Sequence, residues 1–431
     1  MARRRRHDRR APEHKPRDRF ERNTAVSIQA AVRPAGYSAE PTFAEESAAA
    51  LVAAARSLRP LLDEKAGEHE RAGELTQEVV EALDQNGLLA MAAPRRIGGL
   101  AQSSESMAQV AIELSKGCPS TAWVYTIYNS CLWFASKLPR SIQETLFANG
   151  IPRICSPQNG MGQLTPSGDG FELTGRWSYA TGSHHAQFTM VPAILPDQQP
   201  MLVVLPMAAV SLDHTWDVAG MKGTGSDTVV AEHVPVSVAD ICSFADISAT
   251  PPAAVDNADL EPSDFWVNYP LLRAKALGVL VGCAEGLLEQ IVAKSGGPII
   301  YSTYTRKSDS GAYQAAIGRA ATAILAARRL VEGSCARIDA AAKAGSVLGI
   351  PERTEFRGQG ALVVQTLTRA MEDLMDLGGS SAFGTANSAQ RYWRDFSTAA
   401  RHVLFNAQIS YETVGRSVLG IETAIVAPDM L

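Results

Sequence analysis

The histidines are the first residues to consider as catalysts, because an imidazole with its ordinary pKa of about 6.5 gains and loses protons near neutral pH. The chain has eight histidines, and only His402 lies in the C-terminal half. It follows Arg394 and Asp395 in a segment with helical composition. A single histidine in a helix is more often a surface or core residue than a catalyst, so position alone assigns it no role.

Two glycine-rich segments have the composition of ligand-binding loops. Gly378, Gly379, Ser380 and Ser381 follow a predicted helix. Glycine allows positive φ and close backbone approach, and successive N–H groups can form an anion-binding nest. A simple helix C-cap accounts for the same residues. The second segment, residues 220–226 (GMKGTGS), indicates no more than a turn by its spacing alone.

The motifs of several enzyme classes are missing from the sequence. It contains no GxGxxG, Walker, HExxH or GxSxG pattern, which argues against nucleotide-loop enzymes, zinc peptidases and hydrolases. The six cysteines include no CxxC pair, so we expect reduced thiols in a cytoplasmic protein with no metal site and no disulfide. No apolar run approaches the ~20 residues of a membrane span, so no membrane association is expected.

Charge is distributed unevenly along the chain. Residues 1–22 carry ten Lys or Arg and four acids, a net charge of +6, which leaves −11 on the remainder of a chain with formal charge −5. A basic run can contact phosphates, but such runs are commonly disordered and solvated. We therefore predict a disordered tail at residues 1–40, and the acidic remainder argues against nucleic acid as the partner.

The sequence patterns that must position these residues change twice along the chain. Residues 41–150 follow helical periodicity, with Ser141 and Glu144 read as a capping box that begins one helix. Apolar and polar residues alternate from Phe171 to Tyr179, as in a half-buried strand, and short apolar runs continue to about residue 250. Long amphipathic runs fill residues 263–431 and predict a four-helix bundle. The expected order is a helical domain, a β domain at 151–250 and a helical bundle.

This order resembles the acyl-CoA dehydrogenase fold, with an N-terminal helical domain, a central β-barrel or sandwich and a C-terminal four-helix bundle. In detail the chain is most similar to its relatives, the reduced-flavin-dependent (group D) two-component monooxygenases. The resemblance runs from about residue 43 to residue 420. Four stretches carry it: 120–123 (STAW), 175–182 (GRWSYATG), 220–226 (GMKGTGS) and 390–395 (QRYWRD) with His402.

The resemblance implies a monooxygenase that receives reduced FMN or FAD from a separate NAD(P)H:flavin reductase. Dioxygen then adds at flavin C4a, and the resulting hydroperoxide hydroxylates a small aromatic or polycyclic natural product. His402 acts as the general base or holds the substrate phenolate, and Ser156 contacts the substrate hydroxyl. The cofactor-binding residues implied are Trp123, Trp177, Thr181, Gly182, Arg273, Arg306, Gly378, Gly379 and Ser380.

Further details of the family apply to this chain as expectations. Trp123 and Trp177 exclude water, a hydroxyl near Thr181 meets flavin N5, with the Tyr179 or Ala180 backbone as the alternative, and the Gly378 segment binds flavin phosphate across a subunit boundary. Such shared sites imply a homotetramer.

Two departures from the family patterns leave alternatives open. Acyl-CoA dehydrogenases often hold a catalytic Glu where this chain has Val403, which disfavours a dehydrogenase without excluding one. Phenol hydroxylases tend to have a second histidine where this chain has Cys131, near Asn129. These two residues are assigned to the substrate pocket, and a quinol, an indole or an amino sugar oxidised at nitrogen remain candidates. A non-catalytic scaffold that works through its basic tail is the alternative outside the enzymes.

Overall fold

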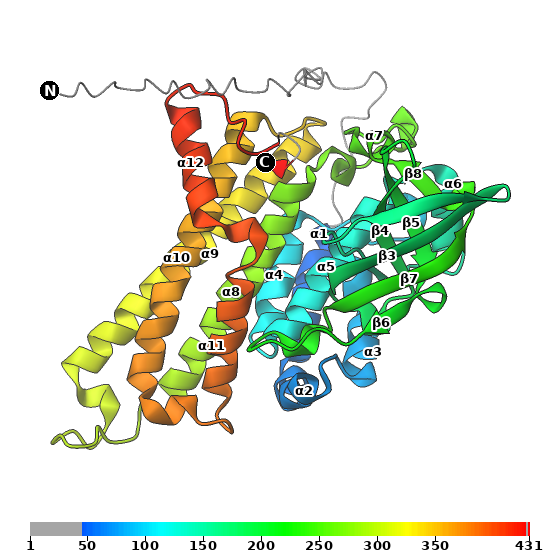
Figure 1. Ribbon diagram of the computed structural model, residues 1–431. Helices are drawn as coiled ribbons and strands as arrows, with labels where there is room; N and C mark the ends of the chain where they lie inside the picture. The colour runs from blue at the N-terminus through cyan, green and yellow to red at the C-terminus, as the bar shows by residue number, and fades with distance from the viewer. Residues whose placement is uncertain (1–44, 428–429) are drawn as a thin grey trace, which may run out of the picture.

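The computed structural model describes residues 45–427 and 430–431, and the predicted basic tail at residues 1–40 lies outside them. The described chain forms helices, then a sheet, then helices again, which confirms the predicted order. In Figure 1 the sheet lies on one side of the molecule and the long C-terminal helices on the other, with most of the N-terminal helices between them.

The N-terminal segment is entirely helical. Its longest helix, α5, begins at Pro119, because a proline at the first helical position loses no hydrogen bond. The predicted capping box is wrong: α6 begins at Arg140 after Pro139, so Ser141 already lies within the first turn. The helices are α1 (Glu45–Ser57), α2 (Arg59–Ala72), α3 (Gln77–Gln85), α4 (Ser104–Ser115), α5 (Pro119–Ala135) and α6 (Arg140–Phe147).

The middle of the chain forms one eight-stranded sheet with the order β6-β7-β3-β2-β4-β5-β8, and β1 pairs with β4. The pairing of β2 with β4 is parallel and joins two antiparallel halves. The register of β3 against β7 shifts between Trp177 and Ala180. The strands are β1 (Ile154–Cys155), β2 (Gly162–Ser167), β3 (Gly170–Ala180), β4 (Phe188–Ile194), β5 (Pro200–Pro206), β6 (Ser211–Asp213), β7 (Asp227–Val236) and β8 (Ile241–Ser243).

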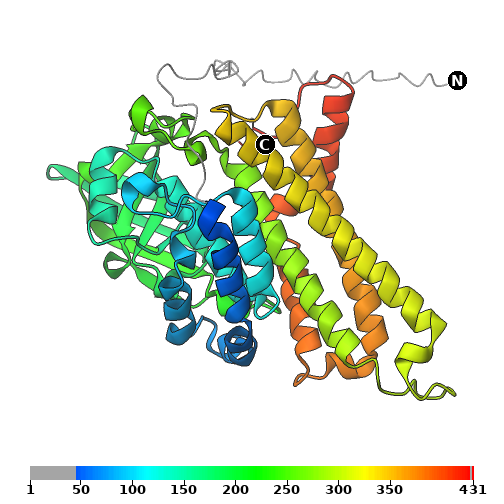
Figure 2. The same ribbon diagram turned by 180° about the vertical axis from the view of Figure 1, so that it is seen from behind.

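After the short helix α7 (Phe244–Ser248), the C-terminal helices form the predicted bundle. They are α8 (Asn268–Ala293), α9 (Gly311–Lys343), α10 (Ile350–Gly378), α11 (Ser388–Ala399) and α12 (Ala407–Val418). The helix α8 contacts α9, α10 and α11 and also packs on α4 and α5, so it joins the two helical segments (Figure 2).

One described helix, α8, is long and apolar enough to cross a membrane by length and composition, and 67% of its apolar window is buried inside the protein. Its apolar character is explained by its central place in the fold, since a helix that is hydrophobic all round is buried in the core of a large protein.

Candidate functional site

His402 lies between α11 and α12, where three elements meet. Its ring contacts the indole of Trp123 on α5 edge-on, with centroids 5.4 Å apart, and lies 6.4 Å from the ring of Phe405. The side chain is exposed although protein surrounds it on several sides, and this desolvation lowers the pKa of His402 to about 4. With its pKa lowered in this way, the ring is neutral at pH 7.

The tautomer of this neutral ring follows from its backbone contact. The Leu404 N–H donates a hydrogen bond to His402 Nδ1 at 3.3 Å. Because Nδ1 accepts, the proton of the neutral ring is assigned to Nε2. The ring therefore presents an N–H donor at its free nitrogen.

Arg273 on α8 lies beside the same segment. Its Nε donates to the Leu404 carbonyl at 3.5 Å, while Nη1 and Nη2 are buried with no hydrogen-bond partner among the described residues. Burial lowers the pKa of Arg273 to about 9, and the neighbouring guanidinium of Arg357 contributes. A buried cation with unsatisfied donors is costly, so this position suits an anionic ligand.

A row of hydroxyl groups lies where β3 meets residues 220–226. The hydroxyl of Ser226 is 2.8 Å from that of Thr181 and 2.7 Å from that of Thr224. Gly182, at φ 75°, donates its N–H to the Thr224 carbonyl and accepts from the Tyr128 hydroxyl of α5 at 2.5 Å. Because a Cβ at Gly182 would overlap the Tyr128 ring, this close approach requires glycine.

The glycine-rich segment 220–226 is a fixed loop. The carboxylate of Asp395 on α11 is fully buried among its neighbours and accepts the Met221 N–H at 2.5 Å. Burial raises the pKa of Asp395 to about 6. A Cβ at Gly220 would overlap the Arg394 backbone, and one at Gly223 would meet His69. The Arg-Asp pair recognised in the sequence therefore positions this loop.

Trp177 occupies a different place from the one expected of a flavin wall. Its ring has no exposed surface and packs against the glycines of β2 and β3, with the indole N–H donated to the Pro192 carbonyl at 2.9 Å. Two residues later, Tyr179 has φ 65° and is 58% exposed. Its ring meets Trp216 edge-on, with centroids 5.6 Å apart. The aromatic ring that β3 presents to a ligand is therefore that of Tyr179.

Of the three other residues expected to contact substrate, Asn129 already binds the backbone, Cys131 is buried and Ser156 is half-buried. Asn129 uses its amide to bind the Ala92 N–H and the carbonyls of Leu88 and Tyr125, so it supports the backbone. Cys131 is buried, and burial raises the pKa of its thiol. Ser156, directly after β1, is half-buried and donates to the Met190 carbonyl at 2.9 Å.

The remaining residues predicted to bind the cofactor lie away from His402. Residues 378–381 lie at one end of α11 and His402 at the other, separated by about 18 Å of helix (Figure 1). The Gly379 N–H bonds to carbonyls of α10, as in a helix C-cap. Arg306 is exposed and pairs with Asp309 at 2.9 Å. A single chain does not bring these residues to the histidine.

Two cavities found among the described residues lie away from His402. One of about 230 Å³ lies between α6 and β4 and includes Asn149 and Phe188. Another, of about 430 Å³, lies between α8 and α9 and includes Glu285 and Arg328. Neither is lined by His402, Trp123 or Thr181, so the site rests on the side-chain geometry.

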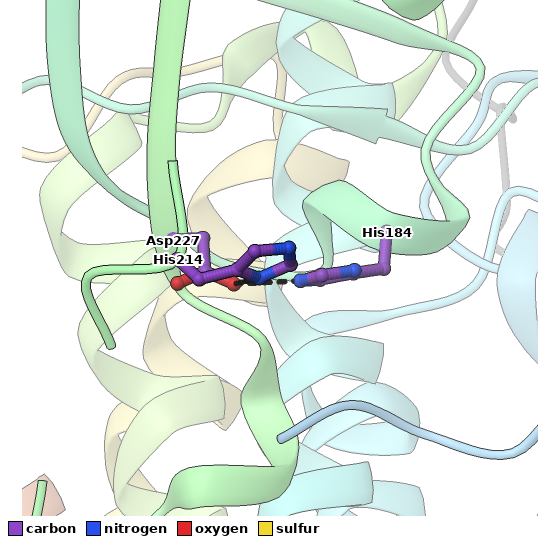
Figure 3. A group of neighbouring side chains, drawn as sticks. All are labelled: His184, His214 and Asp227. Atoms are coloured by element: carbon purple, nitrogen blue, oxygen red, sulfur yellow. Dashed lines mark hydrogen bonds and ion pairs between the residues drawn. The ribbon is translucent and has the colours of Figure 1, made fainter. Parts of the chain in front are cut away.

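Several residues of the site were not found from the sequence. Ser226 lies in the 220–226 stretch that carries the family resemblance, but it was not predicted as a site residue. Its place after two loop glycines could have suggested a hydrogen-bond donor to the cofactor. Tyr128 and Trp216 carry no local signal, because their contacts are made across the fold. A further group, His184, His214 and Asp227, comes together only in three dimensions (Figure 3).

Comparison with known proteins matches both ends of the chain to one family. Residues 44–138 match the model "Acyl-CoA dehydrogenase, N-terminal domain", and residues 276–407 match "Acyl-CoA dehydrogenase, C-terminal domain". The oxygenase component of the FADH2-dependent resorcinol hydroxylase from Rhizobium sp. is 27% identical, over 86% of this chain and 94% of that protein.

Solved structures extend the likeness to the whole fold. XiaF from Streptomyces sp., in complex with FADH2 and glycerol, is 29% identical with a TM-score of 0.83, covering 89% of this chain and 98% of that one. The HsaA monooxygenase from M. tuberculosis, at 23% identity and a TM-score of 0.80, shares the fold across 89% of this chain and 100% of its own. The chain belongs to the acyl-CoA dehydrogenase-fold family of reduced-flavin-dependent monooxygenases.

Proposed function

We propose that this protein is an oxygenase component that hydroxylates an aromatic substrate held between His402 and a reduced flavin. Relatives whose names give an aromatic substrate support this class: resorcinol hydroxylase, and the indole-3-acetate monooxygenase from Pseudomonas putida at 24% identity. The position of the dehydrogenase carboxylate is taken by Val403, which is 76% exposed and has no proton to exchange. A thioester dehydrogenase therefore lacks its base at this place.

The side chains near His402 and beside the loop at residues 220–226 have the chemistry to hold a reduced flavin. The unsatisfied guanidinium N–H groups of Arg273 suit the anionic pyrimidine side of the ring. The hydroxyl row of Thr181 and Ser226 offers a donor to a ring nitrogen, and the exposed ring of Tyr179 offers a stacking surface. Reduced flavin, when bound, activates dioxygen and supplies the oxygen atom for transfer.

The observation that carries the proposal is the hydrogen bond from the Leu404 N–H to His402 Nδ1, which leaves Nε2 as the free nitrogen of a desolvated ring. A neutral ring with its proton on Nε2 donates a hydrogen bond and cannot accept a proton there. We assign it to the substrate oxygen, where the N–H would donate to the phenolate that forms when the substrate hydroxyl loses its proton to solvent, and so activate the ring. Of the two roles expected from the sequence, this geometry favours holding the phenolate over general-base catalysis.

Trp123 and Phe405 hold the ring in place. Their edge-on contacts fix the plane of the imidazole, and both are buried, so they exclude water from one side of it. Ser156 is a second candidate to bind the substrate oxygen. Its hydroxyl accepts a hydrogen bond from Gln158 and donates one to the Met190 carbonyl, and it could donate to the substrate oxygen in place of that carbonyl.

The two roles of His402 are separated by two substitutions. Glutamine places an N–H donor close to the position of Nε2 but cannot act as a base, and alanine removes both properties. If the histidine is a donor, we expect His402→Gln to retain at least about tenfold more product formation than His402→Ala, the ratio a charge-assisted hydrogen bond supplies. Both variants should bind reduced flavin as the wild type does under anaerobic conditions.

Two outcomes would count against this assignment. Equal loss in the two variants would favour general-base catalysis, and loss of flavin binding in both would remove His402 from the substrate side. Resorcinol and indole-3-acetate are the first substrates to test, with hydroxylated product measured against oxygen consumed.

An oxygenase component needs reduced flavin from elsewhere, and a separate NAD(P)H:flavin reductase is the partner we propose. The distance of residues 378–381 from His402 supports a homotetramer, in which this segment serves a neighbouring chain's flavin. A cytoplasmic location and a role in natural-product biosynthesis remain predictions from the sequence. The choice between FMN and FAD rests on whether the neighbouring segment binds an adenosine phosphate.

A further inference from the structure

Two histidines and an aspartate lie close together beside the loop at residues 220–226. Neither the sequence patterns nor the proposed reaction gives them a role. His184 lies in the turn after β3, His214 follows β6, and Asp227 begins β7. His184 Nε2 is 2.7 Å and His214 Nδ1 is 3.3 Å from Asp227 Oδ2 (Figure 3). The three ligand atoms lie within 4.8 Å of one another.

The carboxylate is fixed by the backbone. Asp227 Oδ1 accepts the N–H groups of Thr215 and Trp216 at 2.7 and 2.9 Å, and its side chain is 7% exposed. These two bonds leave Oδ2 directed at both rings. The histidine rings lie nearly parallel, with centroids 5.5 Å apart and 25° between their planes, so both nitrogens face the same small space.

One imidazole of the cluster lies between two carboxylates. His184 Nε2 makes a 2.7 Å hydrogen bond with Asp227 Oδ2, and its Nδ1 lies 3.4 Å from Glu74 Oε2. A metal ion that replaces the Nε2 proton leaves the ring proton on Nδ1, where Glu74 can accept a hydrogen bond from it. A carboxylate behind a metal-binding histidine is the usual outer-shell arrangement.

We propose that His184 Nε2, His214 Nδ1 and Asp227 Oδ2 bind one divalent transition-metal ion of the Zn²⁺ type, with water completing its coordination. Two imidazoles and a carboxylate, without a thiolate, form a donor set that Zn²⁺ accepts. Ligand atoms about 2.1 Å from a tetrahedral ion lie about 3.4 Å apart. The His214 Nδ1–Asp227 Oδ2 contact of 3.3 Å already meets this spacing, and the side chain of His214, 79% exposed, is free to turn toward the ion. His184 Nε2 and Asp227 Oδ2, 2.7 Å apart, must separate by about 0.7 Å to admit it.

The ion would join the two sides of the candidate flavin site. Ser183, next to His184, donates to the Gly225 carbonyl, and Ser226, next to Asp227, bonds to Thr181. A metal at the cluster would therefore hold the turn after β3 against the loop that carries the hydroxyl row. Its expected role is structural, because an ion that binds only the folded state stabilises it by mass action.

The test compares metal binding in two exposed-histidine variants of the full-length, untagged protein. After treatment with a chelator, Zn²⁺ is titrated by calorimetry, and Co²⁺ is titrated by its visible absorption, which reports tetrahedral ligation. His214→Ala removes an exposed ligand without disturbing the core. His233→Ala is the matched control, because His233 is also exposed on the β domain and pairs with Glu172 at 2.7 Å, outside the cluster.

We expect one equivalent of Zn²⁺ to bind the wild type and His233→Ala equally, and His214→Ala at least about tenfold more weakly. At one fixed concentration, Zn²⁺ should also raise the unfolding temperature of the first two proteins by more than that of His214→Ala. The proposal fails if the wild type takes up no equivalent, or if His214→Ala binds as tightly as the control. Asp227→Asn, which keeps an acceptor for the two backbone amides, provides a second ligand substitution with the same expected loss.

Discussion

Lys275 is a buried charge whose replacement should stabilise the protein. It lies on α8 with no exposed surface, and no described residue accepts a hydrogen bond from its Nζ. Burial lowers the pKa of Lys275 to about 7, opposed in part by the nearby thiols of Cys131 and Cys335. Methionine has a similar unbranched length without the charge, so Lys275→Met should fill the same space.

The magnitude follows from the difference between the two states of the lysine. The pKa is 10.5 in the unfolded chain and about 7 in the folded one. Each pH unit between these values corresponds to about 1.4 kcal/mol, which gives a ceiling of about 5 kcal/mol. Between pH 7 and 10.5 the unfolded state binds more protons, so the wild type gains stability as pH rises. The advantage of methionine is full below pH 7 and disappears above 10.5.

The assay is urea denaturation of the wild type and Lys275→Met at pH 7 and at pH 10, with Lys294→Met as control. Lys294 is exposed at the end of the same helix, so its replacement should change the unfolding free energy by no more than about 0.5 kcal/mol. Lys275→Met should exceed the wild type at pH 7, and the difference should shrink at pH 10. A variant no more stable than the wild type, or a difference independent of pH, would refute the argument and indicate a partner for the ammonium group.

Two further predictions concern the residues proposed to contact substrate and cofactor. Because desolvation lowers the pKa of His402 to about 4, the ring should not titrate between pH 8 and pH 5, so the wild type and His402→Gln should show pH profiles of the same shape for the hydroxylation rate at saturating reduced flavin; an acid limb near pH 6.5 in the wild type alone would contradict a neutral ring. Arg273→Met should weaken anaerobic binding of reduced flavin at least about tenfold, because it removes unsatisfied buried donors. Arg306→Ala removes only an exposed ion pair and should have little effect. Similar losses in both variants would contradict the proposed contact between Arg273 and the flavin.

The sequence predicts most of the fold because its long elements have clear periods. The alternation from Phe171 to Tyr179 corresponds to β3, and the amphipathic runs after residue 263 correspond to the bundle helices. The residues at which helices begin are harder to predict, because neighbouring residues can each act as the N-cap. At α6, Pro139 supplies the fixed φ that begins a helix, and this local restraint outweighs the side-chain pattern of Ser141 and Glu144.

Residues of the candidate site could be named from the sequence where a short local motif contains them. Residues that come together only through tertiary contacts were missed. Asp395 and His402 were found through a short motif, and the structure adds the Met221 N–H that Asp395 binds. His184, His214 and Asp227 are separated by 30 and 13 residues and lie in three different parts of the β domain, so no spacing rule for metal ligands applies to them. Only the pairing of β6 with β7 and of β7 with β3 brings them together.

The exposure of Tyr179 in place of Trp177 on β3 has a specific physical cause. Residues two apart on a regular strand point to the same face, so alternation predicts that both rings share one environment. The register shift between Trp177 and Ala180, together with the positive φ of Tyr179, breaks this rule and turns the tyrosine outward while the tryptophan stays in the core. A bulge of this kind re-aims side chains beside functional sites. Because Thr181 follows the bulge and bonds to Ser226, the loop at 220–226 stabilises the same distortion that exposes Tyr179. The exposed aromatic ring and the hydroxyl row are therefore two consequences of one local departure from regular strand geometry.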